Sequence, residues 1–202
     1  MNTEWLLPLL SFAIISCMTP GPNNVLLTQS GARFGVRRSV PHVFGITAGL
    51  GVLLLIMATG LNALFYGWPA LQWVLKLLGS AYLLWLGWKI ASAPPLVLNS
   101  GDASSAERPW GPFQAIAFQF CNPKAWLMAI SAVGSFSLVG KAYWPSVGGM
   151  VVIYSLVCAL SCLIWARFGA EVGRWLSTPR AWCLFNRWMG IATAACVLLL
   201  WH

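Results

Sequence analysis

Six apolar stretches of about 20 residues divide the sequence, with short gaps between them. Crossing the hydrocarbon core of a bilayer as an α-helix takes about 20 mainly apolar residues. The stretches fall at 5–30, 43–66, 71–91, 113–136, 143–167 and 182–201. Of the 202 residues, 59% are hydrophobic and 8% are charged, whereas a soluble domain keeps roughly a quarter of its residues charged. The sequence therefore predicts an all-α integral membrane protein with six transmembrane helices.

The basic residues lie mainly in the first, third and fifth gaps. The chain has 12 Lys and Arg against 4 Asp and Glu. The basic residues in or beside these gaps are Arg33, Arg37, Arg38, Lys89, Arg108, Arg167, Arg174 and Arg180. Cytoplasmic loops carry an excess of Lys and Arg, so we expect these gaps in the cytoplasm and both termini on the periplasmic side. The basic residues accompany no recognition element of a nucleic-acid-binding fold, so no nucleic-acid partner is expected.

Residues 92–112 separate the chain into two halves, 1–91 and 113–202. This linker is rich in Pro, Ser and Gly, which predicts a mobile cytoplasmic loop. Residues 76–81 (Lys-Leu-Leu-Gly-Ser-Ala) align with residues 187–192 (Arg-Trp-Met-Gly-Ile-Ala). An odd number of helices per repeat turns the second copy upside down, as in many secondary transporters. We therefore expect a single transmembrane domain made of two inverted three-helix repeats, with helices one and four broken.

The sharpest local signal is a cluster of helix-breaking residues inside the first stretch. Its residues are Thr19, Pro20, Gly21, Pro22, Asn23 and Asn24. Proline removes a backbone donor and clashes with the preceding turn, so this cluster must interrupt the helix. Broken backbone at membrane depth survives only where it is buried in protein or lines a wet cavity. We expect a substrate-binding site here; the alternative is a kink whose asparagines only satisfy the backbone.

The fourth stretch carries a similar break. Gln119 and Asn122 offer side-chain amides beside Pro123, which interrupts the helix, and Lys124 follows. Lys124 is a basic residue well inside a predicted span, where a charge normally faces a cavity or a partner. It is placed to attract a substrate carboxylate or to hold the site closed. The alternative is that its flexible stem carries the ammonium to the membrane interface.

Together the two breaks resemble those of the lysine-exporter/threonine-homoserine-exporter (LysE/RhtB) superfamily, and the resemblance covers essentially the whole chain. The Met-Thr-Pro-Gly-Pro-Asn-Asn at 18–24 and the Ala-Tyr-Leu-Leu-Trp-Leu-Gly-Trp-Lys-Ile at 81–90 are most similar to its cysteine/O-acetylserine exporter branch. The resemblance implies an amino-acid exporter of the bacterial inner (plasma) membrane, driven by a proton or other ion gradient. The signature positions that it implies are Thr19, Pro20, Gly21, Pro22, Asn23, Asn24, Asn122, Pro123 and Lys124.

The acidic residues restrict the substrate. All four, Glu4, Asp102, Glu107 and Glu171, lie at the edges of predicted spans or in gaps. A site without a carboxylate should not prefer cations such as lysine, so we expect small neutral amino acids of the cysteine/O-acetylserine or threonine/homoserine type. A carboxylate proton relay is not visible either. His42 is the candidate coupling residue because imidazole titrates near neutral pH; the alternative is an interfacial polar residue.

Other functions are less compatible with the sequence. An enzyme needs a nucleophile–base or metal constellation at one depth, and the predicted spans contain none. We expect no cofactor and no metal, because Cys158 and Cys162 share a helix face without a neighbouring His or carboxylate. A passive channel stays open because broken helices also line pores. A heavy-metal exporter of the same superfamily stays open because Cys17 and Cys121 lie close to the breaks. Small-residue faces also suit a homodimer.

Overall fold

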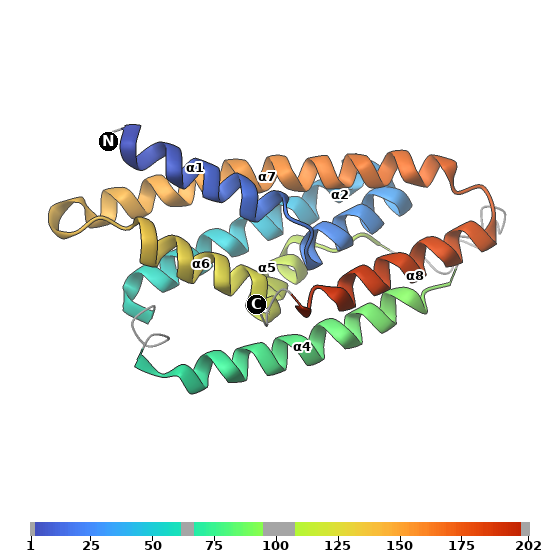
Figure 1. Ribbon diagram of the computed structural model, residues 1–202. Coiled ribbons are helices and arrows are strands. Elements are labelled where there is room, and N and C mark those ends of the chain that lie inside the picture. Colours follow the sequence, from blue (N-terminus) through green and yellow to red (C-terminus); the bar gives the residue numbers. More distant parts are fainter. Residues whose placement is uncertain (1–2, 62–66, 95–107, 199–202) are drawn as a thin grey trace.

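The structure is a computed structural model, and it describes residues 3–61, 67–94 and 108–198. The described residues form helices and contain no strand, so the all-helical prediction is confirmed. Its helices are α1 (Thr3–Met18), α2 (Pro22–Ile56), the π-helical turn Met57–Leu61, α4 (Pro69–Ala91), α5 (Pro112–Cys121), α6 (Pro123–Phe136), the 3₁₀ turn Gly140–Ala142, α7 (Tyr143–Trp175) and α8 (Pro179–Ala195). Figure 1 shows them as one elongated bundle.

The first apolar stretch is broken where the sequence predicted, and the gap after it is helical. α1 ends at Met18, and α2 starts at Pro22 and runs on through the expected loop at 31–42. A sharp turn at Gly35 (φ 77°, ψ 167°) divides α2 into two arms, 22–34 and 36–56. Only glycine adopts that conformation readily. The chain follows the first arm outward and the second arm back along the bundle (Figure 1).

Few of the described helices are both long enough and apolar enough to cross a membrane alone. By length and composition, two segments qualify among the described residues, Pro22–Leu61 and Gly140–Trp175, while Trp5–Met18 is a shorter apolar helix. The fourth stretch consists of α5, with 10 residues, and α6, with 14. Each is too short to span alone, since a span takes about 20 residues. The six-crossing arrangement therefore stays a prediction.

Helix α2 lies at the centre of the bundle and packs closely against α7, α5 and α6. The first arm of α2 meets α7 through small residues. A Cβ on Gly169 would lie 1.9 Å from the carbonyl oxygen of Thr28, and a Cβ on Gly31 would lie 2.0 Å from that of Ala166. Small residues allow backbones of membrane helices to approach in this way. These contacts fix the arm that begins at the first break.

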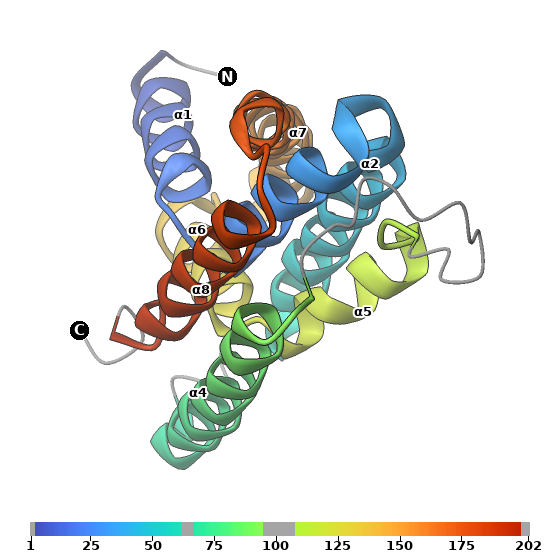
Figure 2. The same ribbon diagram turned by 90° about the vertical axis from the view of Figure 1, so that its right-hand side faces the viewer.

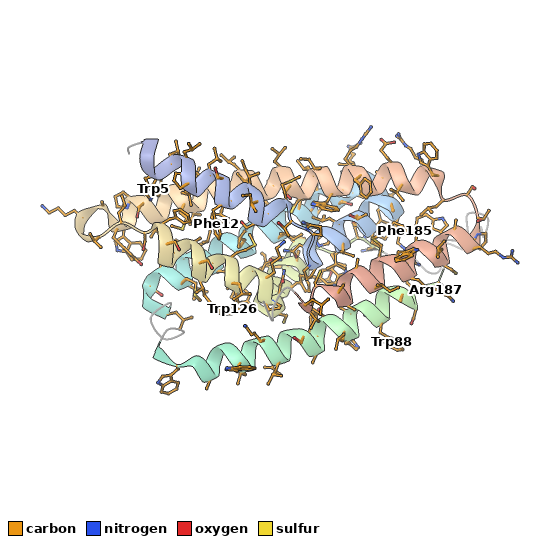
Figure 3. The ribbon with its side chains drawn as sticks, in the orientation of Figure 1. Trp5, Phe12, Trp88, Trp126, Phe185 and Arg187 are labelled. Atoms are coloured by element: carbon orange, nitrogen blue, oxygen red, sulfur yellow. The ribbon has the colours of Figure 1, made fainter. Side chains whose placement is uncertain are left out.

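The other helices cover this centre. Trp5 of α1 donates from Nε1 to the carbonyl of Phe136 at 2.7 Å, and Phe12 packs on the Phe136 ring, which ties α1 to the end of α6. Helices α4 and α8 pack side by side (Figure 2). The outer face of α4 carries exposed apolar side chains, among them Trp88 (Figure 3). Such a face suits contact with lipid.

The two ends of the bundle differ in charge. At one end, here called the basic end, lie the Gly35 turn, the end of α4 and the α7–α8 turn (Figure 1). In or beside these segments lie Arg33, Arg37, Arg38, Lys89, Arg174 and Arg180, while Arg108 precedes α5 and Arg167 lies eight residues before the end of α7. The opposite end contains Lys141, in the turn before α7. Most of the predicted mobile linker, residues 95–107, lies outside the described residues.

Candidate functional site

The first break separates α1 from α2 by three residues. Gly21 is the N-cap of α2 in extended conformation, and Pro22 is its first residue. The buried side chain of Asn24 donates from Nδ2 to the carbonyls of Cys17, at 3.1 Å, and Thr19, at 2.9 Å. These carbonyls have lost their helical partners, and unpaired backbone groups are costly inside a membrane protein. Asn24 therefore stabilises the end of α1.

Asn23 joins the first break to α5. Its Nδ2 donates to Oε1 of Gln119 at 3.0 Å, and Nε2 of Gln119 donates to Oδ1 of Asn23 at 3.2 Å. Gln119 is fully buried and also donates to the carbonyl of Ala115 at 3.0 Å. The two amides thus satisfy each other across 96 residues of sequence. Two of the predicted site residues are brought together by this pair.

The second break lies between α5 and α6, at Asn122. Its buried side chain caps α6, since Oδ1 accepts from the backbone N–H of Lys124 at 3.1 Å. Pro123 is the first residue of α6 and packs against Gly79 of α4, where a Cβ would lie 2.7 Å from the proline Cγ. Proline is favoured at the first position of a helix because that N–H has no helical partner. Asn122 and Pro123 therefore build the break.

Lys124 joins the two breaks. Its Nζ donates to the carbonyl oxygen of Thr19 at 2.5 Å and lies 3.4 Å from that of Pro20. Its stem covers Gly21, where a Cβ would lie 2.7 Å from the lysine Cδ. The ammonium therefore points into the first break and not along its own helix toward an interface. An ammonium bound to freed carbonyls balances the partial negative charge at the end of α1.

A small cavity lies between the breaks. Its volume is about 30 Å³, where one water needs about 10–15 Å³ by the same measure. Among its lining residues are Cys17, Gly21, Asn23, Asn24, Gln119, Asn122 and Lys124. A second cavity of about 180 Å³ shares Ser16 and Lys124 with it and is lined further by Thr19 and Pro22. Lys124 thus separates two cavities, and an amino acid would need side chains to move before it could enter the smaller one.

Helix α7 contributes cavity residues that the sequence did not single out as site residues. Cys158, Ser161 and Cys162 line the small cavity, and Oγ of Ser161 donates to the carbonyl of Cys17 at 2.9 Å. Their i, i+3, i+4 spacing is the signal that could have identified them, because it places them on one helix face. Within the described part of the chain, no group of three His, Cys, Asp or Glu is arranged to hold a metal ion. Cys121 is exposed and is not among the lining residues of this cavity.

His42 lies apart from the breaks. It belongs to the second arm of α2, is 1% exposed, and stacks on Trp110 with ring centroids 5.4 Å apart. Neither ring nitrogen has a hydrogen-bond partner among the described residues. It lines a third cavity, of about 310 Å³, near the basic end. His42 is thus buried within the protein, and its role in coupling stays a prediction.

The comparisons with known proteins identify a family. Residues 14–200 match the model of a protein family described as LysE type translocator. The chain belongs to the LysE type translocator family. The predicted membership is confirmed, and the matched region includes both breaks.

Relatives of this LysE type translocator are named for the compounds that they export. The chain is 31% identical over 159 residues to the cysteine/O-acetylserine efflux proteins of Escherichia coli strain K12 and Salmonella typhimurium. The match covers 79% of this chain and 79% of each relative. No solved structure matches the chain.

Proposed function

We propose that this translocator exports small neutral amino acids across the bacterial inner membrane, with cysteine and O-acetylserine as the first candidates. The names of its relatives support this substrate class. So does the chemistry at the breaks, because the described residues that line the small cavity include amides, hydroxyls, thiols and one ammonium but no carboxylate. A threonine or homoserine substrate fits the same chemistry and ranks second.

The observation that carries the proposal is the position of the Lys124 ammonium on the carbonyls of Thr19 and Pro20. An amino acid brings its own ammonium and its own carboxylate. Its carboxylate would attract Lys124 away from the first break, and its ammonium would take the vacated carbonyls. The charge balance at the end of α1 is then the same before and after the exchange. Lys124 acts in this scheme as an internal ligand that keeps the site closed between substrates.

We propose secondary transport, with a proton or another ion gradient as the energy source. His42 is the candidate coupling residue, since it is a titratable side chain buried in the described part of the bundle. A passive channel is the second candidate, because broken helices also line pores. The described cavity contains thiols without a metal-ligand group of three, so a heavy-metal exporter ranks last.

The inverted repeat and the orientation also belong to this proposal. Gly87 of α4 and Gly190 of α8 face each other, because a Cβ on either would lie within 2.7 Å of the other's carbonyl oxygen. Such a reciprocal contact is expected across a two-fold axis. This contact favours Gly87 as the counterpart of Gly190 in the proposed repeat. The sequence alignment instead matched Gly190 with Gly79, which faces Pro123. The concentration of Lys and Arg at the basic end supports placing that end in the cytoplasm and both termini in the periplasm.

A vesicle flux assay tests the proposal. Protein reconstituted with its basic end outward is given radiolabelled cysteine outside and, in separate experiments, a pH gradient or a sodium gradient of either sign. We expect accumulation above the outside concentration with one sign of the gradient. Equilibration without accumulation would identify a channel, and a flux no larger than that of protein-free vesicles would reject cysteine as the substrate.

A further inference from the structure

A cationic cavity lies near the basic end, away from the breaks. This cavity, here called the basic vestibule, has a volume of about 310 Å³. Arg33 of α2, Lys89 of α4 and Arg108, just before α5, line it. Pockets for small ligands start at about 300 Å³, so the vestibule has room for a free amino acid, unlike the cavity between the breaks.

The charges of the basic vestibule favour an anion. Lys89 lies over the ring of Trp85 with its Nζ 5.1 Å from the centroid, and Arg33 donates to the carbonyl of Pro94 at 2.8 Å. Among the described residues that line the vestibule, no acidic side chain is present. Like charges held together on apolar walls attract a counter-ion strongly. Two guanidinium groups and an ammonium together suit a carboxylate, which accepts hydrogen bonds from both kinds of donor.

His42 provides an independent sign of a ligand. It lines the same vestibule, is 1% exposed, and neither of its ring nitrogens has a hydrogen-bond partner among the described residues. Buried polar groups are almost always hydrogen-bonded, so an unsatisfied imidazole calls for a partner that the described residues do not supply. Trp110 covers the imidazole at 5.4 Å and also lines the vestibule. A shift of this indole would bring the imidazole within reach of a ligand.

The basic vestibule is connected to the breaks along one helix. Asn23 at the small cavity and Arg33 at the vestibule belong to the first arm of α2, and ten residues of helix span about 15 Å. Leu26, Leu86 and Ile90 form an apolar wall of the vestibule, and Phe118, which precedes Gln119 of the small cavity, packs with them. Phe118 also packs edge-on against Trp110, with ring centroids 5.4 Å apart. A polar substrate would have to part this apolar cluster to pass from the vestibule toward the small cavity.

We propose that the basic vestibule is a second binding site, which receives the carboxylate of an amino acid before the apolar cluster opens toward the breaks. The inference rests on the proposed export of amino acids, and it adds a reception step on the cytoplasmic side. Lys89 and Arg108 hold the carboxylate, and the aromatic walls accept the remainder of a small side chain. The vestibule raises the local concentration of substrate near the closed break.

The test measures cysteine transport from the side of the basic end, in the vesicles described above. Lys89→Gln and Arg108→Gln each remove one cation from the vestibule. Arg180→Gln is the matched control, because Arg180 lies at the same end of the bundle but lines a different cavity. We expect Lys89→Gln and Arg108→Gln to raise the KM for cysteine about tenfold, the loss of one charged hydrogen bond, with the maximal rate within about twofold. Lys89→Arg and Arg180→Gln should keep the wild-type KM.

Two further results would overturn the inference. If the wild-type protein transports cysteine and both Lys89→Gln and Arg108→Gln keep its KM, the vestibule is rejected as a binding site while the proposed function stands. The same assay in phosphatidylcholine vesicles with and without phosphatidylglycerol identifies a lipid occupant: a KM increase seen only with the anionic lipid would assign the vestibule to a lipid headgroup. If the wild-type protein moves no cysteine, the proposed function fails first.

Discussion

The ammonium of Lys124 donates to the carbonyl oxygen of Thr19, which lies 105 residues earlier in the chain. This contact joins the end of α1 to the start of α6 and closes the space between the two broken helices. Any substrate that needs the carbonyls of the first break must displace it. The breaks are thus coupled to each other through one side chain.

Removing the Lys124 ammonium should impair transport more than folding. A hydrogen bond to a charged group contributes about 1.5–3 kcal/mol, so we expect Lys124→Ala to lower cysteine transport roughly tenfold to a hundredfold while the protein still inserts. Rates in vesicles, normalised to inserted protein, measure the effect. Lys141→Ala is the control, because Lys141 is a lysine outside the breaks, in the turn before α7. Normal transport by Lys124→Ala would show that the second break is only a structural kink.

Asn24→Ala should affect stability as well as transport. Its amide is the donor to the carbonyls of Cys17 and Thr19, so its removal takes one partner from a buried acceptor and one from a partly buried acceptor. Leaving one buried group unsatisfied costs about 1–3 kcal/mol. We expect a lower Tm in detergent and a roughly tenfold to hundredfold loss of transport. An unchanged Tm together with wild-type transport would contradict the role given to this amide.

The amide pair of Asn23 and Gln119 should behave as one unit. Each side chain bonds the other, so Gln119→Ala removes both bonds of the pair from Asn23, and Asn23→Ala leaves Gln119 with its bond to Ala115. The second substitution should therefore add little further loss. We expect the unfolding free energies of Asn23→Ala, Gln119→Ala and the double variant to give a coupling of about 0.5–1.5 kcal/mol. Additive effects would mean that the pair does not persist in the membrane.

Gly169→Ala should destabilise the contact between α7 and the first arm of α2. Its new Cβ would lie 1.9 Å from the carbonyl oxygen of Thr28, and overpacking typically costs about 1–3 kcal/mol. Gly148→Ala is the matched control on the same helix, because nothing lies within 4 Å of the position of its Cβ. Thermal unfolding in detergent should show a lower Tm for Gly169→Ala and an unchanged Tm for Gly148→Ala. Equal Tm values for the two variants would contradict the close packing.

The orientation predicts a simple fusion result. A reporter inserted at Ser100 should face the cytoplasm, and one placed after His202 should face the periplasm, because the basic end carries most of the Lys and Arg. Fusions of alkaline phosphatase and green fluorescent protein at both sites measure this. Reporters on the same side would contradict six crossings.

The local interruptions of the chain could be predicted from the sequence because their cause is local. Pro22 and Pro123 start helices in the structure as well, since a missing N–H and a fixed φ act on the nearest turn whatever the rest of the fold does. The role of Gly35 was not predicted. Arg33, Arg37 and Arg38 predict a loop around this turn. In the structure the residues on both sides of Gly35 are helical.

The sequence by itself determined the helical class, the two breaks, the family and six of the fifteen described residues that line the small cavity. Which of those residues touch was decided only by the tertiary structure. Three hydrogen bonds of the site join residues that are 96 to 144 positions apart: Asn23 with Gln119, Lys124 with Thr19, and Ser161 with Cys17. Such contacts depend on how whole helices pack, and here that packing follows from the close approach of Gly31 and Gly169 to facing carbonyls. Proline acts on its own turn, whereas the partner of an amide or an ammonium is whatever the packed helices bring within about 3 Å of it.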